Sequence, residues 1–208
     1  MDFEQLVTIA ADLHCFSPGM VTAGEKLDQV RVQLSRWVRT GRVIRIHKGW
    51  YTLREPYRRV RIDLHVIACT IKAGTYVSLE SALEFHGVIP EYVPETTCVT
   101  TGRPVTVHTP FGRIRYRHSK DDGFFGYSRH EAGVQHAHIA TPEKALLDLL
   151  YLTPGSEDAA YLSELRLQNM EQFDLDEMRR MAERFRSPRL VRSALLLGEL
   201  IGTGEIWV

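Results

Sequence analysis

Residues 27–53 decide the fold and read LDQVRVQLSRWVRTGRVIRIHKGWYTL. With successive side chains turned by about 100°, the first half predicts an amphipathic helix from about Glu25 to Thr40, ended by Gly41. Two β-prone stretches follow, 43–46 and 50–53, and the glycine in the His47-Lys48-Gly49 segment between them predicts a hairpin. The helix side that should face a core carries Leu27, Val30, Leu34, Trp37 and Val38.

Two shorter helices are expected before this stretch. Apolar residues at helical spacing predict a helix over residues 3–13. Ser17-Pro18 is typical of a helix start, so a second helix should run from there to about Ala23, where Gly24 breaks it. The order helix, helix, helix, hairpin within 55 residues predicts a winged helix-turn-helix, in which the last helix enters the major groove of DNA.

The outer side of the third predicted helix carries groups suited to DNA. Gln can pair with adenine and Arg with guanine, and an exposed Val32 could contact a thymine methyl group. A polar outer face is usual for any amphipathic helix, but the basic hairpin that follows favours contact with the sugar-phosphate backbone. The predicted DNA-binding residues of helix and hairpin are Lys26, Asp28, Gln29, Arg31, Val32, Ser35, Arg36, Arg39, Arg42, Arg45, His47 and Lys48.

The basic residues are concentrated in one segment. The formal net charge is zero, with 26 Lys and Arg against 26 Asp and Glu. Residues 26–61 contain eleven basic residues and two acids, a net charge of +9, whereas residues 1–25 carry −4 and residues 62–208 carry −5. An electropositive face of this kind suits a polyanion, although a solvated charged surface would give the same counts.

Length and composition are those of a globular protein. The 208 residues, 44% of them hydrophobic, suffice for one large domain or two small ones. No apolar run approaches the roughly 18 residues of a membrane span, and Asp2 and Glu4 stand where a secretory signal would be positive. Cys15, Cys69 and Cys98 form no CxxC pair and fit reduced, buried thiols. We therefore expect a cytoplasmic protein without a membrane partner.

The rest of the chain predicts a second unit of mixed structure. Helices are expected near residues 62–71 and 78–85 and after Thr141-Pro142-Glu143, and the pattern is helical from Ser156 onward. Short runs bounded by Gly and Pro predict strands over residues 97–101, 105–109, 113–118 and 135–140. The expected fold class is α+β. It comprises a winged helix-turn-helix domain over 1–55 and a sheet-and-helix domain with a linker and a helical C-terminal tail over 56–208.

A second basic strip lies in the predicted strand over 113–118. Alternation along a strand places Arg113, Arg115 and Arg117 on one face, with Ile114 and Tyr116 on the other. The three arginines could extend the DNA contact, or they could hold the acidic C-terminal tail, and both interpretations stay open. The acids of that tail are Glu157, Asp158, Glu164, Glu171, Asp174, Asp176 and Glu177.

Histidines in the middle of the chain suggest a metal site only weakly. His136 and His138 would share one face of a strand, with His130 and Glu131 nearby, but no second ligand pair has a known spacing.

Hydrolase chemistry is also not indicated. Ser78, Ser81 and His86 lack a G-x-S-x-G turn, and Ser78 is better interpreted as a helix cap. The adjacent Glu143 and Lys144 fit a capped helix start better than a catalytic pair. We expect no enzyme activity, no metal and no cofactor.

Three motifs resemble one family of regulators. Residues 32–53, VQLSRWVRTGRVIRIHKGWYTL, are similar to the winged-helix head of AbiEi-type antitoxins, which are transcriptional regulators of type IV toxin–antitoxin (abortive-infection) systems. Residues 76–87, YVSLESALEFHG, and 139–149, IATPEKALLDL, resemble two further motifs of that family in the same order. The resemblance covers about residues 15–153 and does not extend to the C-terminal helices.

The resemblance implies a repressor that binds operator repeats of its own operon. It also implies a functional rather than physical pairing with a nucleotidyltransferase-like toxin. The expected function is therefore sequence-specific binding of double-stranded DNA without catalysis. The alternative is a protein–protein interaction module that binds a toxin directly through the winged helix or the C-terminal domain. A nucleic-acid-processing enzyme is a more distant alternative, because the chain lacks acids clustered at metal-binding spacing.

Overall fold

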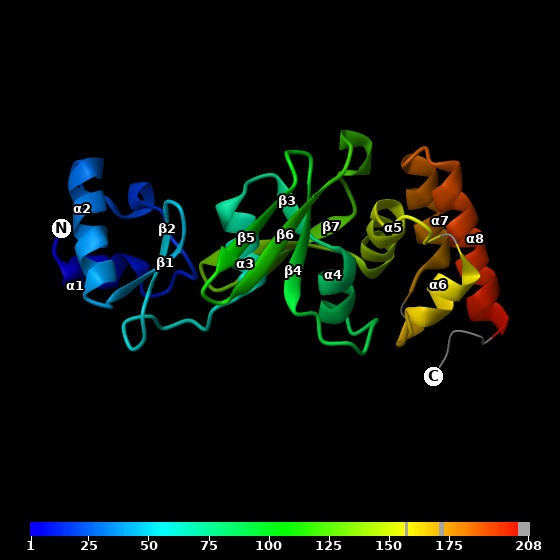
Figure 1. The fold of residues 1–208 in the computed structure, drawn as a ribbon, viewed down its shortest axis with the longest axis horizontal. Helices are drawn as coiled ribbons and strands as arrows, with labels where there is room; N and C mark the ends of the chain where they lie inside the picture. Colours follow the sequence, from blue (N-terminus) through cyan, green and yellow to red (C-terminus); the bar gives the residue numbers. More distant parts are fainter. Residues whose placement is uncertain (157, 171–172, 204–208) are drawn as a thin grey trace.

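A computed structural model describes residues 1–156, 158–170 and 173–203 and shows an α+β fold (Figure 1). The molecule is elongated, with the N-terminal elements at one end, a six-stranded sheet in the middle and helices α5 to α8 at the other end. The N-terminal elements are α1 (Phe3–Ala10), the 3-10 helix η1 (Pro18–Val21), α2 (Leu27–Arg39), β1 (Val43–His47) and β2 (Trp50–Leu53).

Local sequence explains where the N-terminal elements begin and end. Asp2 and Gln5 form a reciprocal capping box at the start of α1. Gly41, with a φ of +73°, follows the end of α2, and Gly49, with a φ of +80°, closes the turn between β1 and β2. The expected order of elements is confirmed. The first helix is shorter than expected, and the second is a single 3-10 turn.

The central sheet mixes parallel and antiparallel pairs in the order β5-β6-β4-β3-β8-β7. β4 pairs in parallel with β6, and β3 in parallel with β8, whereas the other three pairs are antiparallel. Four of its strands match expectation to within two or three residues, but β3 and β7 were not foreseen as strands. The six strands are β3 (Thr75–Val77), β4 (Glu95–Thr100), β5 (Val105–Thr109), β6 (Gly112–His118), β7 (Tyr127–Ala132) and β8 (Gln135–Ala140).

Helices cover this sheet and form the far end of the molecule. α3 packs on β3, β4, β6 and β8, and the Tyr116 hydroxyl donates to its Ala68 carbonyl at 2.8 Å. α4 packs on β4 and α5, and α5 in turn packs on α7 and α8. Among the described residues, no helix is both long and apolar enough to cross a membrane. The helices are α3 (Leu64–Ile71), α4 (Leu79–Phe85), α5 (Pro142–Leu152), α6 (Ala159–Glu164), α7 (Leu175–Arg184) and α8 (Pro188–Thr203), with a short 3-10 turn, η2 (Asp121–Gly123).

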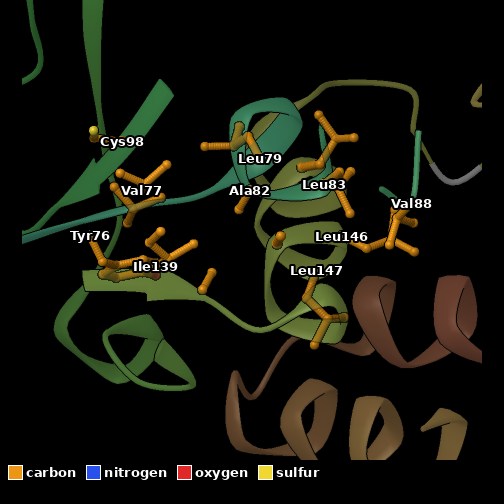
Figure 2. Close-up of a cluster of buried hydrophobic side chains, with 14 of the residues drawn as sticks. Tyr76, Val77, Leu79, Ala82, Leu83, Val88, Cys98, Ile139, Leu146 and Leu147 are labelled. Atoms are coloured by element: carbon orange, nitrogen blue, oxygen red, sulfur yellow. The ribbon is translucent and has the colours of Figure 1, made fainter. Parts of the chain in front are cut away.

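Buried apolar side chains form two separate clusters. The smaller cluster lies within the N-terminal elements and includes Leu6, Val30 and Leu34. The larger cluster joins the sheet to α3, α4, α5 and the C-terminal helices. Figure 2 shows part of it, where Leu83 on α4 and Leu146 on α5 point into the space between their helices. Two cores in one chain are typical of two packed units.

The two clusters are joined by a buried junction. Ile46 and Trp50 of the β1–β2 hairpin pack against the larger cluster rather than their own. The Gln135 side chain donates to the Cys15 carbonyl at 2.9 Å and accepts from the backbone N–H of His14 at 2.6 Å. Separating the N-terminal elements from the sheet would break these buried hydrogen bonds. The junction therefore fixes the two parts to each other.

A fully buried polar network ties α5 to β3. The Lys144 ammonium forms an ion pair with Asp148, one turn further along α5, and donates to the Tyr76 hydroxyl at 2.8 Å. Asp148 also accepts from the Tyr76 hydroxyl at 2.8 Å and from the Ser78 hydroxyl at 2.7 Å. Three aromatic rings surround the ammonium, with the nearest centroid, that of Phe185, at 4.6 Å.

This network corrects the interpretation of Ser78 as a helix cap. Ser78 occupies the N-cap position of α4, but its hydroxyl makes no capping hydrogen bond and binds Asp148 instead. A carboxylate buried away from solvent needs hydrogen-bond donors from the protein, and the Ser78 hydroxyl is one of the donors to Asp148.

Candidate nucleic-acid interface

The twelve residues predicted to bind DNA on α2 and the hairpin are all exposed. They belong to the outer side of α2, its flanking residues and the β1–β2 hairpin, and these elements lie in the part of the molecule away from α5 to α8 (Figure 1). Val32 lies on this outer side with 53% of its surface exposed, as expected for a residue without a role in the core. The structure therefore brings the predicted side chains of α2 and the hairpin to one end of the molecule.

The opposite side of α2 packs on the smaller core. Val30 and Leu34 are fully buried, and the Trp37 ring contacts Phe3 edge to face at 5.4 Å. The prediction that Leu27 belongs to the core face is wrong, because 38% of its surface is exposed. Leu27 is the first residue of the helix, and its side chain is only partly covered by neighbouring residues.

Several polar groups on the outer side of α2 have no side-chain partner among the described residues. In the part of the chain that the structure describes, Gln29, Arg36 and Arg39 form no side-chain hydrogen bond or ion pair, whereas Arg31 is paired with Asp28 at 3.0 Å. Gln29, Val32 and Arg36 line a shallow, open depression of about 530 Å³. Unpaired donors and acceptors on a solvated helix face can bind a ligand without first breaking internal contacts.

The β1–β2 hairpin presents its basic groups at the turn and along β1. His47 pairs with Trp50, and a bulge between Arg45 and His47 interrupts the regular register. Lys48 lies exposed at the tip of the turn. Arg42, in the connection from α2, is an exposed residue whose guanidinium carbon lies over the Phe3 ring, 5.0 Å from the centroid.

The three arginines of β6 have partners outside the N-terminal elements. Arg115 forms an ion pair with Glu95 at 3.0 Å, and Arg113 lies 3.6 Å from the same carboxylate. Arg117 donates to the Leu152 carbonyl at the end of α5. The cavity that they line and the depression on α2 have no residue in common.

The observed partner of Arg113 and Arg115 is thus not one of the tail acids. Glu164 alone among those acids lines the same cavity, and Glu157 and Glu171 lie outside the described residues. Sequence reasoning missed Glu95 because only the parallel register, with Glu95 opposite Arg113, brings the two strands together.

The histidines near β8 and the adjacent Glu143 and Lys144 are the remaining candidates for a chemical site. Among the described residues, no three His, Cys, Asp or Glu side chains are placed to hold a metal ion. Glu131, opposite His136 in the register, is paired with Arg129 at 2.7 Å. Glu143 accepts a hydrogen bond from the Asp174 backbone at 3.0 Å, so it holds the start of α7 and does not pair with Lys144.

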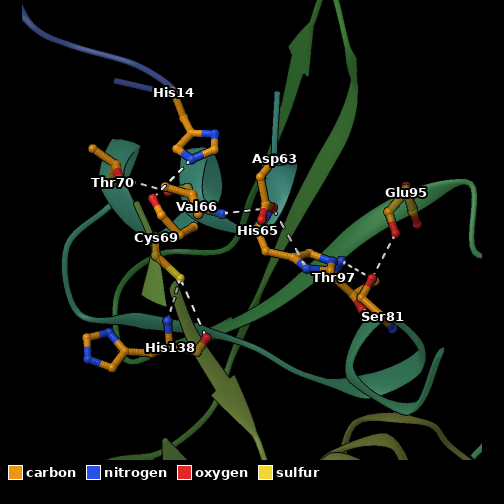
Figure 3. A network of polar contacts seen from close by, with 11 residues as sticks. His14, Asp63, His65, Val66, Cys69, Thr70, Ser81, Glu95, Thr97 and His138 are labelled. Carbon is orange, nitrogen blue, oxygen red and sulfur yellow. Dashed lines mark hydrogen bonds and ion pairs between the residues drawn. The ribbon is translucent and has the colours of Figure 1, made fainter. Parts of the chain in front are cut away.

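All three cysteines are free thiols. Burial raises the pKa of Cys15 to about 12, although a hydrogen bond with Thr70 opposes the shift. Burial also raises the pKa of Cys69, whose sulfur contacts the backbone of His138 (Figure 3), and that of Cys98. Thiols with raised pKa are poor nucleophiles, so these cysteines are packing residues.

Comparison with known proteins shows a likeness in fold. No family model matches the chain, and no curated protein matches it in sequence. Among solved structures, the crystal structure of the RV2827C protein from Mycobacterium tuberculosis is similar, with a TM-score of 0.53 and 13% sequence identity. The match covers 94% of this chain and 80% of that protein. The chain therefore shares the α+β architecture of a solved protein over nearly its whole length.

Proposed function

We propose that this protein is a sequence-specific, double-stranded DNA-binding regulator of transcription. Residues 1–55 act as a winged helix-turn-helix domain, in which α2 enters the major groove and the β1–β2 hairpin lies along the sugar-phosphate backbone. The observation that carries the proposal is a row of polar side chains on the exposed side of α2, Gln29, Arg36 and Arg39, which have no partner in the described part of the chain. Residues 56–208 form the second domain, to which the buried junction at Gln135 fixes the first.

The regulatory role follows the resemblance of residues 32–53, 76–87 and 139–149 to AbiEi-type antitoxins. The protein then represses its own operon from the cytoplasm and opposes a nucleotidyltransferase-like toxin without a stable complex. The exposed charge of the N-terminal elements supports binding to an operator. The identity of the adjacent open reading frame tests this role, because an antitoxin gene should lie beside a nucleotidyltransferase gene.

Arg36→Ala should weaken binding to the specific operator by about 1–3 kcal/mol, because a bidentate arginine–guanine pair contributes that much discrimination. Arg36 is exposed on the middle of the outer side of α2 and has no partner in the described chain. Quantitative gel shifts should use a duplex from upstream of the coding sequence and a random duplex.

Arg129→Ala is the matched control, since Arg129 is an exposed arginine on β7, outside the N-terminal elements. It should leave both affinities unchanged. An equal loss on both duplexes would make Arg36 a phosphate contact, and no loss on either would contradict the proposed reading helix.

Lys48→Ala should weaken binding to all duplexes alike. Lys48 lies at the tip of a tight turn beside Gly49, where it can reach a phosphate more easily than a base edge. Loss of one phosphate contact should make the slope of log affinity against log salt shallower by about one unit. Titrations at several salt concentrations measure this, and a loss confined to the operator would contradict the role of the hairpin.

A further inference from the structure

A cavity of about 460 Å³ lies beside the central sheet. Its walls come from β4 and β6 of the sheet, from α4, α5 and α6, and from the segment 89–94. The volume falls within the range of roughly 300–1,000 Å³ that small-molecule sites occupy. None of the residues predicted to bind DNA on α2 or the hairpin lines it.

One wall of the cavity is basic. Arg113, Arg115 and Arg117 reach it from alternate positions of β6, and they face the single carboxylate of Glu95 on β4. Each guanidinium has five N–H donors, so one carboxylate leaves most donors of Arg113 and Arg115 free. Arg117 is held in place by its hydrogen bond to the Leu152 carbonyl.

The backbone of Glu95 is held by a hydrogen bond from α4. The Ser81 hydroxyl on α4 donates to the Glu95 carbonyl at 3.0 Å and accepts from the Thr97 backbone at 2.8 Å (Figure 3). One oxygen of the Glu95 carboxylate is buried without a hydrogen-bond partner among the described residues. Glu95 thus holds Arg113 and Arg115 side by side and cancels only part of their positive charge.

The remaining walls are apolar, with acids at several points. Apolar side chains line them, namely Leu83 on α4, Leu149 on α5, Leu165 just after α6, and Ile89 and Val93 in the segment 89–94. Glu80, Glu91 and Glu164 also line the cavity, and Glu91 forms an ion pair with Arg166 at 3.8 Å. Acids beside the arginine row repel a large polyanion such as duplex DNA, whereas a small ligand can place a single anionic group against the arginines.

We propose that this cavity binds a small organic acid, with its anionic group against Arg113 and Arg115 and its apolar body against Val93 and Leu165. Guanidinium groups bind carboxylates by paired, charge-assisted hydrogen bonds, and the apolar walls provide burial for a hydrocarbon body. The site is separate from the proposed DNA interface and does not depend on it.

Titration calorimetry with three probes tests the two halves of this site in the full chain. Octanoate carries both an anionic group and an apolar body, acetate carries only the anion, and octanol carries only the body. Octanoate should bind saturably with one site per chain. Octanol should bind at least about tenfold more weakly because it lacks the charged group, whose hydrogen bonds contribute about 1.5–3 kcal/mol. Acetate should bind at least about tenfold more weakly because it lacks the apolar chain that the walls would bury.

Two pairs of variants locate the binding. Arg115→Gln should weaken octanoate binding by about tenfold or more, whereas Arg129→Gln, which breaks a similar exposed Arg–Glu pair on β7, should not. Val93→Asp places a negative charge at the position where the apolar body would pack and should abolish binding. Val134→Asp, at the exposed β7–β8 turn, is its control.

Three results would overturn the proposal. The first is no saturable heat with octanoate, and the second is octanol binding as tightly as octanoate, which would leave the arginines without a role. The third is a loss of DNA affinity in the Arg113/Arg115/Arg117 triple alanine variant comparable to that of Arg36→Ala. That result would assign the strip on β6 to the nucleic-acid interface.

Discussion

Raising the salt concentration from about 50 to 200 mM should weaken binding of this protein to duplex DNA about 10³-fold, since each phosphate contact adds roughly −0.9 to the slope of log affinity against log salt. With Arg36 assigned to a base, six exposed basic side chains on α2 and the hairpin are available for phosphates. They are Lys26, Arg31, Arg39, Arg42, Arg45 and Lys48. Fluorescence anisotropy with a labelled duplex at four or five salt concentrations measures the slope directly.

The same titration separates DNA binding from the rival function. A protein–protein interaction module that binds a toxin directly would show no saturable binding to DNA at low salt, or a slope near zero. A random duplex should give nearly the same slope as the operator, because phosphate contacts carry no sequence information. A shallow slope with tight operator binding would contradict the interface proposed on α2 and the hairpin.

The N-terminal elements could be predicted from local sequence because local rules decide them. Gly41 and Gly49 adopt positive φ at a helix end and a tight turn, positions at which glycine carries no steric penalty. The apolar stripe that includes Val30 and Leu34 identified the buried side of α2. The exposed side then followed by exclusion, which is why the seven predicted residues on α2 are all exposed.

The strip on β6 could be predicted only in part. Alternation correctly placed the arginines on one face, with Ile114 and Tyr116 buried on the other. Their partner depends on which strand lies beside β6, and that strand is β4, reached through a parallel register rather than a hairpin. Long-range pairing of this kind leaves no local signal, so the cavity beside Glu95 was not foreseen.

The buried network on α5 was also not predictable from spacing. Lys144 and Asp148 stand four residues apart, as do many solvated helix pairs. Tertiary packing takes them out of water, since Tyr76 and Phe125 lie against the pair and α7 and α8 pack on α5. Burial lowers the pKa of Lys144 and raises that of Asp148, while their mutual attraction opposes both shifts.

Asp148→Asn should destabilise the protein by about 3–5 kcal/mol at neutral pH, because removing one partner of a buried pair leaves the other charge uncompensated. The substitution keeps the shape of the side chain and an oxygen that can accept from Tyr76 and Ser78. The loss of stability therefore reports the missing negative charge and not a cavity left by a smaller side chain. Urea unfolding of the variant and the parent protein at the same pH gives the difference.

The pH dependence of that loss distinguishes a buried charge from simple misfolding. Without Asp148, the pKa of folded Lys144 should lie further below its unfolded value, so raising the pH between these two values releases a proton from the folded state first. The unfolded state then holds more protons, and stability rises with pH. The difference in unfolding free energy from the parent protein should therefore shrink between neutral pH and about pH 10.

Glu131→Gln is the control, because it breaks an exposed pair with Arg129. It should cause no measurable change in stability at neutral pH or at about pH 10. A loss in Asp148→Asn that is independent of pH would show that this substitution leaves the protonation of Lys144 in the folded protein unchanged, which would contradict the lowered pKa expected here.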